Sequence, residues 1–540
     1  MFQRKIQLKN PGLLMGARVL MGPRVLMGPG LLMGPRVLLG LRFLLMVLFC
    51  HHAAMSLEAQ WTKGAQLDSS DMALDLAEAL SFQKYPTYDQ YLEMMQGFAG
   101  DYPEICRLDT FGTSEEGRLL LALKISDHVE LDEPEAAFLY SSTMHGDEIL
   151  GFVLLLRLAD TLLSAYGTDL EINRVVDELA IWINPLANPD GSYSNDSNLS
   201  LENSVRLNTD GIDLNRNFPD PAKGEADDTT GRALENQHMM RFLSRERFSM
   251  SANLHGGAEV VNYPWDHTPR LHADDDWYRF ISREYADEAM AVDPDYMWGW
   301  PDDGITNGWD WYAAYGTRQD YVNYYLGGRE VTLELSNIKK LPSTELEHHW
   351  EINHRSLLNY ISQSLYGIRG RVSDLETGNP LQAQIKIENH DSAYSVVYSD
   401  ETHGAYYRLI KEGVYELVVS APGYHNDTIA DVSVTDYLAT FLDIKLKAKE
   451  LAVKVQEAPS FRIFPNPAME HFFVEAENIP HGELELSVHS MDGRLIYKQI
   501  QPYQGGKIEI STAGMEAGIY LLRCSSGTLL EVHRLLVIKP

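Results

Sequence analysis

Four residues of this chain have the types and spacing of a metal site that works on water. His145 and Glu148 lie three residues apart, and His255 and Glu334 follow much farther along the chain. Two imidazoles and one carboxylate form the ligand set of catalytic zinc sites that leave one coordination position open for water. A further carboxylate beside such a site can take a proton from the attacking water. We therefore predict that His145, Glu148 and His255 bind one zinc ion and that Glu334 is the general base.

The segments around these residues predict how they come together. Residues 136–142 (AAFLYSS) and 179–183 are typical of buried strands, residues 248–254 and 331–335 are predicted to form two more strands, and residues 149–163 are predicted to form an amphipathic helix. His145 and Glu148 then lie on the turn after a strand, and His255 follows directly on another strand. Ligands delivered from several strand ends meet where open α/β sheets place their sites. The pattern therefore predicts an α/β fold with the site at one edge of its sheet.

Several longer strings accompany the four residues. In chain order they are PDG at 189–191, DLNRNFPD at 213–220, SANLHGG at 251–257, GITNGWDWY at 304–312 and VTLELS at 331–336. Through these strings, residues 82–367 resemble the zinc metallocarboxypeptidases, and within them the regulatory branch that includes carboxypeptidases N, E, D and M. The resemblance implies a mixed-sheet zinc carboxypeptidase fold with helices on both faces. It also implies an enzyme that hydrolyses the C-terminal peptide bond.

The resemblance implies roles for four residues around the metal. Arg206 would polarise the scissile carbonyl, and Asn215 and Arg216 would hold the terminal carboxylate of the substrate. Tyr312 would close over the bound residue. These roles agree with the chemistry, because a guanidinium binds a carboxylate through paired hydrogen bonds and stabilises an oxyanion electrostatically. Taken singly, the arginines would be read as surface ion pairs and the tyrosine as core packing.

Two further positions bear on the choice of substrate. Asp266 falls where the regulatory branch carries the acid that selects a basic terminal side chain, and Gln319 falls on a second position lining the same pocket. On its own, Asp266 would be read as a solvated loop acid. The leading prediction is an enzyme that releases Lys or Arg from the C-termini of peptides and proteins. The alternatives are another terminal specificity, a cell-wall peptide substrate, or a non-catalytic peptide-binding protein on the same fold.

Composition limits the partners of the 540-residue chain. The formal net charge is −32, so nucleic acid is not expected as a partner, whereas basic peptides would be attracted. The three cysteines, Cys50, Cys106 and Cys524, are far apart and fall into different predicted segments, so no disulfide framework is indicated.

The first 59 residues have the character of a leader. A repeat with a period of six, rich in Gly and Pro, runs from residue 11 to Gly40. We expect translation to start at or near Met33, followed by a secretory signal built on two arginines and the apolar run 43–49. That run is too short for a membrane span, so no stable transmembrane anchor is expected. Lipidation of Cys50 is an alternative, but small residues are lacking before it.

Beyond the catalytic region the sequence changes to short alternating strands punctuated by glycine. This part resembles the transthyretin-like β-sandwich that follows the peptidase domain in the regulatory branch. The last eighty residues, with PNP at 465–467 and DGR at 492–494, resemble the sorting domain of type IX secretion substrates. The alternative for them is an ordinary third β-sandwich.

These patterns predict how the chain is divided and where it goes. The predicted parts are a repeat and signal peptide (1–59), a catalytic domain (75–366), a transthyretin-like β-sandwich (367–447), a linker (448–460) and a sorting domain (461–540). The fold class is thus α/β followed by two small all-β sandwiches. The expected partner for export is the type IX secretion machinery, and the expected location is outside the cell or on its surface, reached through the periplasm.

Overall fold

The computed structural model describes residues 67–195, 198–299, 302–392, 394–449, 460–479 and 482–539. The described residues up to Lys449 form one compact unit, and those from Ser460 onward form a second. The predicted repeat, the predicted signal segment and most of the predicted linker lie outside the described residues.

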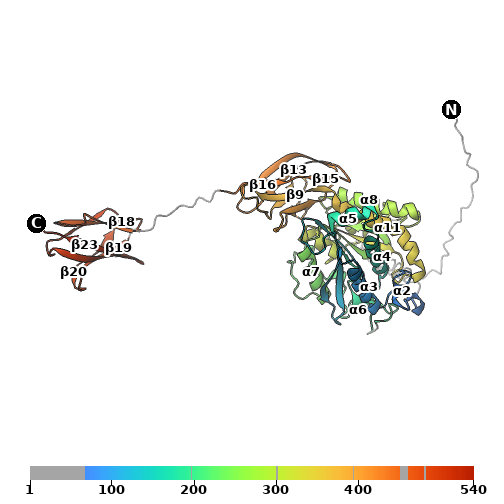
Figure 1. Ribbon diagram of the computed structural model, residues 1–540. Helices are drawn as coiled ribbons and strands as arrows, with labels where there is room; N and C mark the ends of the chain where they lie inside the picture. Colours follow the sequence, from blue (N-terminus) through green and yellow to red (C-terminus); the bar gives the residue numbers. More distant parts are fainter. Residues whose placement is uncertain are drawn as a thin grey trace, which may run out of the picture. The chain divides into compact units, whose positions relative to one another are not determined.

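A mixed sheet of eight strands forms the centre of the first unit (Figure 1). Its order is β1-β2-β4-β3-β5-β8-β6-β7. The strands are β1 (Cys106–Thr113), β2 (Leu119–Ile125), β3 (Ala136–Ser142), β4 (Leu179–Asn184), β5 (Met250–His255), β6 (Ala258–Tyr263), β7 (Ile305–Asn307) and β8 (Arg329–Ser336). The central strands β4, β3, β5 and β8 are parallel, whereas β2 is antiparallel to both β1 and β4, and β6 is antiparallel to β8. The four strands predicted from the sequence are these four central strands, and the prediction of a mixed sheet is confirmed.

Helices cover both faces of this sheet, as predicted. Successive strand residues point to opposite faces, so Phe138 and Tyr140 of β3 lie in one hydrophobic core and Leu139 lies in another. The first core is completed by α3 (Tyr88–Asp101), α4 (Leu150–Ala165), α5 (Leu170–Glu178), α8 (Asp275–Val292) and α11 (Leu346–Ser362), and the second by α7 (Leu234–Glu246). The shorter helices are α2 (Leu76–Ala79), α6 (Pro189–Ser192), α9 (Gly308–Trp311) and α10 (Arg318–Tyr321). The helix predicted at 149–163 corresponds to α4.

Two smaller sheets follow in the same unit and share one hydrophobic core. One has the order β11-β10-β13-β14, and the other has the order β12-β9-β15, with β16 also pairing with β9. The strands are β9 (Gly367–Asp374), β10 (Gln384–Ile387), β11 (Val397–Tyr398), β12 (Ala405–Arg408), β13 (Gly413–Ser420), β14 (Asp427–Val434), β15 (Ala439–Phe441) and β16 (Ile444–Leu446). The alternating run 439–446 therefore forms two strands and not one. It is broken at Leu442, whose carbonyl approaches Gly370 of β9 so closely that a Cβ there would lie 2.1 Å away.

A buried charge cluster joins these smaller sheets to the large one. Asp274, at the start of α8, accepts hydrogen bonds from Arg329 of β8 at 2.8 Å and from Arg408 of β12 at 2.7 Å. Arg408 also pairs with Asp391, and His390 Nε2 lies 2.8 Å from Asp274 Oδ1. Burial alone would raise the pKa of Asp274, but Arg408 and Arg329 hold that pKa well below its usual range. Because removing one partner would leave a buried charge unpaired, this cluster binds the smaller sheets firmly to the larger one.

The second unit also consists of two sheets around one core. Their orders are β17-β18-β21 and β20-β19-β22-β23. The strands are β17 (Ser460–Phe464), β18 (His471–Glu477), β19 (Gly482–Ser490), β20 (Leu495–Tyr503), β21 (Lys507–Ser511), β22 (Gly518–Ser526) and β23 (Leu529–Val537). The prediction of two small all-β sandwiches after the α/β part is confirmed. The predicted boundaries of the parts stay predictions.

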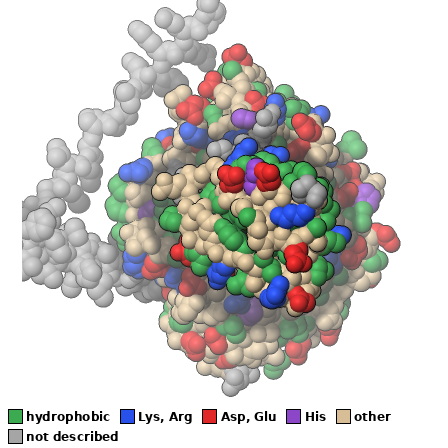
Figure 2. Space-filling model, turned by 90° about the vertical axis from the view of Figure 1, so that its left-hand side faces the viewer, with side chains coloured by type: hydrophobic (Ala, Val, Ile, Leu, Met, Phe, Trp, Pro, Cys, Tyr) green, Lys and Arg blue, Asp and Glu red, His purple; other side chains and the backbone are tan. Residues whose placement is uncertain are grey.

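Two features of the described residues bear on stability and surface. Cys106 and Cys524 are both buried free thiols, so the described residues contain no disulfide. Figure 2 shows acidic and basic side chains interspersed with hydrophobic ones on one face of the molecule. Across the described part of the chain, no single helix combines the length and the apolar content needed to cross a membrane.

Candidate functional site

The three predicted metal ligands converge at the carboxyl ends of β3 and β5. His145 and Glu148 lie in the connection from β3 to α4, and His255 is the last residue of β5. Nδ1 of His145, Nδ1 of His255 and Oε2 of Glu148 lie 2.7–3.1 Å from one another. Each of the three residues is at most 4% exposed. Two imidazole nitrogens and a carboxylate oxygen that converge in this way suit a zinc ion, and the three residues form a buried metal-binding triad.

The outer nitrogens of both imidazoles have polar partners. Nε2 of His145 lies 3.1 Å from Asp213 Oδ1, and Nε2 of His255 lies 2.8 Å from the side-chain amide of Asn253. Such partners fix the ring orientation and leave Nδ1 facing the metal position. The sequence by itself indicates no role for Asp213 or Asn253, although both lie within strings that carry the resemblance.

Glu148 is held in its charged form by two neighbouring side chains. Burial alone would raise its pKa, but His145 and Lys339 hold that pKa well below its usual range. Lys339 Nζ donates to Glu148 Oε1 at 2.9 Å. A ligand to zinc must be deprotonated, so this environment suits the predicted role. No signal in the sequence pointed to Lys339.

Glu334 lies beside the triad on the neighbouring strand. In the parallel pairing of β5 and β8 it stands opposite His255. It is 9% exposed, and its Oε2 has no hydrogen-bond partner among the described residues. Burial and the nearby Glu148 raise the pKa of Glu334 well above its usual range. A carboxylate with a free oxygen and a raised pKa beside a metal triad has the properties of a general base.

Arg206 lies beside the triad and is partly exposed. Its Nε donates to Asp213 Oδ2 at 3.0 Å, and its Nη1 lies 3.3 Å from Glu148 Oε1. The side chain is 33% exposed. The guanidinium can therefore reach a substrate oxygen close to the metal position, as its predicted role requires.

The three other residues predicted to contact substrate gather near the same place. Asn215 Nδ2 lies 3.4 Å from His255 Nε2. Arg216 Nη1 donates to the Asn215 carbonyl at 2.7 Å, and its guanidinium carbon lies 6.0 Å from the ring centre of Tyr312. Tyr312 follows α9 and is 47% exposed, which leaves its side chain room to move. The structure thus brings together a guanidinium, an amide and an exposed phenol beside the triad.

Asp266 is a buried carboxylate with neutral partners. It accepts hydrogen bonds from Thr317 Oγ1 at 2.7 Å, from Asn262 Nδ2 at 3.0 Å and from Gln319 Nε2 at 3.2 Å. None of the described lysines and arginines forms an ion pair with it, although Asp266 is only 4% exposed. Burial and the neighbouring Asp320 raise its pKa to about 7. A buried carboxylate is costly without a cation, so this position favours a ligand that supplies one.

Two further oxygens next to Asp266 are also without a partner. Asn262 Oδ1 and Gln319 Oε1 are buried and accept no hydrogen bond from the described residues. The space beside them depends on Gly308, because a Cβ there would lie 2.0 Å from Asp266 Oδ1. The predicted proximity of Asp266 and Gln319 is found, whereas the contributions of Asn262 and Thr317 were not predicted.

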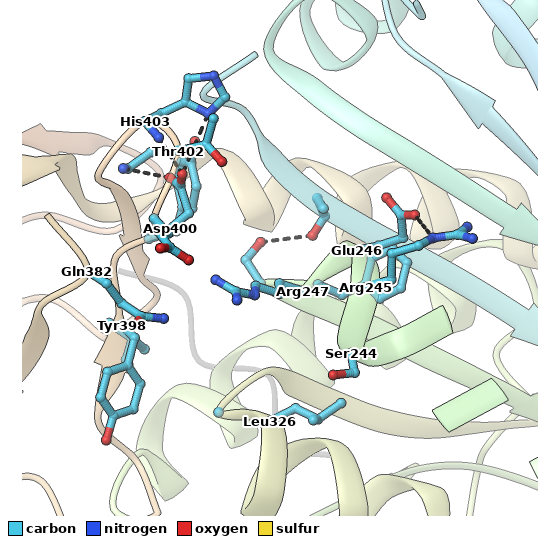
Figure 3. Close-up of a pocket in the computed structure, with 18 of the residues that line it drawn as sticks. Ser244, Arg245, Glu246, Arg247, Leu326, Gln382, Tyr398, Asp400, Thr402 and His403 are labelled. Atoms are coloured by element: carbon cyan, nitrogen blue, oxygen red, sulfur yellow. Dashed lines mark hydrogen bonds and ion pairs between the residues drawn. The ribbon is translucent and has the colours of Figure 1, made fainter. Parts of the chain in front are cut away.

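A cavity of about 740 Å³ lies elsewhere in the first unit, between the end of α7 and the loops around β11 and β12 (Figure 3). Arg247 reaches into it toward Gln382 and Asp400. No residue of the metal triad lines this cavity, and neither Glu334 nor Asp266 does. The chemistry predicted for this chain therefore does not involve the cavity.

Known proteins resemble this chain in two regions. Residues 91–356 match a family described as zinc carboxypeptidase, and residues 462–539 match a secretion system C-terminal sorting domain. Carboxypeptidase SOL1 of Arabidopsis thaliana is 33% identical over 408 residues, which cover 73% of this chain and 79% of that protein. Carboxypeptidase M of Mus musculus is 31% identical over 417 residues, covering 74% and 90%. Human carboxypeptidase D is 35% identical over 345 residues, which span 61% of this chain but 24% of the relative.

Proposed function

This chain belongs to the zinc carboxypeptidase family, and we propose that it releases Lys or Arg from the C-termini of peptides and proteins. It is a zinc-dependent metallocarboxypeptidase, and the proposal concerns its substrate. The observation that carries the proposal is Asp266, a buried carboxylate that forms no ion pair with any of the described residues. A substrate ending in Lys or Arg would supply a cation. Its N–H groups would also find acceptors in Asn262 Oδ1 and Gln319 Oε1.

The residues around the triad support a hydrolytic mechanism. His145, Glu148 and His255 would hold a zinc ion, which would supply Lewis-acid chemistry to the scissile carbonyl and to water near neutral pH. Glu334 takes the proton of the attacking water and passes it to the leaving amine. Arg206 stabilises the negative charge that develops on the carbonyl oxygen.

The remaining contacts orient the substrate. Asn215 and Arg216 hold the terminal carboxylate, which restricts cleavage to the last peptide bond. Tyr312, half-exposed beside Arg216, closes over the bound residue and keeps water away from it. Each of these roles is a proposal that rests on the arrangement described above.

A comparison of substrates tests the proposed specificity. Purified protein would be assayed with peptides that differ only in their last residue, which is Lys, Arg, Phe, Leu or Glu. We expect kcat/KM for Lys and Arg to exceed that for Leu and Phe by about 100-fold or more, because an apolar side chain leaves Asp266 buried and unpaired. The peptide ending in Glu should be the poorest substrate. A preference for Phe would reject the assignment of Asp266.

We also propose that the second unit directs export of the enzyme through a type IX secretion system, to the medium or the cell surface. The match of residues 462–539 to a secretion sorting domain supports this. The unit has its own core and contains none of the residues proposed for hydrolysis. It is therefore expected to be dispensable for catalysis.

A truncation tests the role of the second unit. A chain that ends just before Ser460 should fold, bind zinc and cleave basic C-termini with a kcat/KM within about twofold of the full chain, because the first unit is compact by itself. In the native host it should accumulate in the periplasm, while the full chain reaches the surface or the medium. Peptidase activity in each cell fraction measures this. Equal export of both forms would contradict the sorting role, and loss of activity in the soluble truncated protein would make the second unit part of the enzyme.

A further inference from the structure

Helix α10 makes contact with both parts of the proposed substrate site. The backbone N–H of Arg318 donates to Asn215 Oδ1 at 2.9 Å, and Asn215 is the residue proposed to hold the terminal carboxylate. The next residue, Gln319, donates to Asp266. The position of α10 therefore fixes the orientation of the Asn215 amide, which can present its Nδ2 to the substrate only while Oδ1 is engaged by this N–H.

The side chain of Arg318 anchors α10 to the central sheet. It is fully buried, and its Nη2 donates to Glu330 Oε2 at 2.9 Å. Glu330 Oε2 also accepts a hydrogen bond from Ser251 Oγ at 2.7 Å. Glu330 lies on β8 with Glu334, and Ser251 lies on β5 with His255. The ion pair thus connects α10 to the two strands that carry the proposed base and a metal ligand.

Stability alone is a weak explanation for this ion pair. Nε and Nη1 of Arg318 and Oε1 of Glu330 are buried without a hydrogen-bond partner among the described residues. Buried groups that are only partly satisfied cost stability, and replacing a buried ion pair with apolar side chains of similar size is often neutral or stabilising. The ion pair makes a directional contact between α10 and β8, and an apolar pair would not reproduce that contact.

We propose that Arg318, through its ion pair with Glu330, is a positioning residue that places Asn215 to bind the terminal carboxylate of the substrate. The inference rests on the proposed exopeptidase function, but it does not depend on the preference for Lys or Arg. Every substrate has the same terminal carboxylate, so the effect should not depend on its last side chain.

Three variants test the role of the pair: Arg318→Met, Arg318→Lys and the double variant Arg318→Met/Glu330→Met. Each would be assayed with peptides ending in Lys and in Leu, together with Tm and zinc content. Arg318→Met should lower Tm, because Glu330 stays buried without its cation. It should also raise KM for both peptides by about tenfold or more, the effect of one hydrogen bond to a charged group, with kcat changed by less than about threefold. In Arg318→Lys the cation is kept, so KM for both peptides should be closer to the wild-type value than in Arg318→Met.

The double variant separates positioning from stability. It should recover most of the lost Tm, while KM stays raised for both peptides. Arg408→Met is the matched control, since Arg408 is equally buried and paired with Asp274. This control should lower Tm and leave KM within about twofold of the wild type.

Three results would overturn the inference. They are a double variant whose KM returns to the wild-type value, a single variant that loses Tm without a change in KM, and a rise in KM confined to one peptide. Failure of the proposed specificity would look different: the wild type would then prefer Leu to Lys, while Arg318→Met would still raise KM for both peptides.

Discussion

Replacement of Glu334 by Gln is expected to leave zinc bound and to lower kcat by about 10²–10⁴-fold. Gln has the same size but cannot take a proton from water, and Oε2 of Glu334 makes no hydrogen bond within the described structure that the change would break. The measurements are kcat with a peptide ending in Lys, zinc content per chain, and Tm.

A matched substitution controls for the loss of one carboxylate. Glu284→Gln changes a half-buried glutamate on α8 whose partner is Gln363, away from the triad. It should leave kcat within about twofold of the wild type. If Glu334→Gln kept near-normal kcat with zinc unchanged, another group would have to be the base.

The second large effect is expected at Asp266. Asp266→Ala should lower kcat/KM for peptides ending in Lys or Arg by about 100-fold or more, because their cation would be buried without a partner. For a peptide ending in Leu, kcat/KM should change by no more than about threefold, because Leu never paired with the carboxylate. The change in the ratio of the two values measures the selectivity that Asp266 confers.

Asp266→Asn separates charge from packing. The amide keeps the size of the side chain and an oxygen that can accept from Thr317, so Tm should stay close to that of the wild type. The preference for Lys and Arg should nevertheless fall nearly as far as in Asp266→Ala. An equal loss for peptides of every terminal residue would show that Asp266 supports the fold and does not select the substrate.

The sequence predicted the centre of this fold better than its edges. Strands β3, β4, β5 and β8 are buried along nearly their whole length because helices cover both faces of the sheet. Their ends carry His145, Glu148 and His255, so the triad could be predicted with the strands. The break between β15 and β16 could not, because it depends on the approach of Leu442 to Gly370, a contact made only in the folded chain.

The contacts that tune the site were the hardest to predict. Thr317 hydrogen-bonds Asp266 across 51 residues of sequence, and Lys339 reaches Glu148 across 191. Neither residue stands out by type or spacing, because a lysine or threonine in a loop is usually exposed to solvent. Residue types and spacing can identify groups that carry chemistry, whereas the partners that set their charge are known only from the three-dimensional arrangement.

The charge cluster around Asp274 has a consequence for how this enzyme can be rearranged. Arg408 reaches Asp274 from a strand 134 residues later in the chain, and a recombination that cut between α11 and β9 would separate the two. The fragment before the cut would keep the pair of Asp274 and Arg329 but lose the contacts of Asp274 with Arg408 and His390. The part of the chain that can be moved intact into a chimera is therefore the whole compact unit up to Lys449. A chimera that exchanges the sorting domain can be joined after that residue, whereas one that exchanges β9–β16 must bring a matched arginine with it.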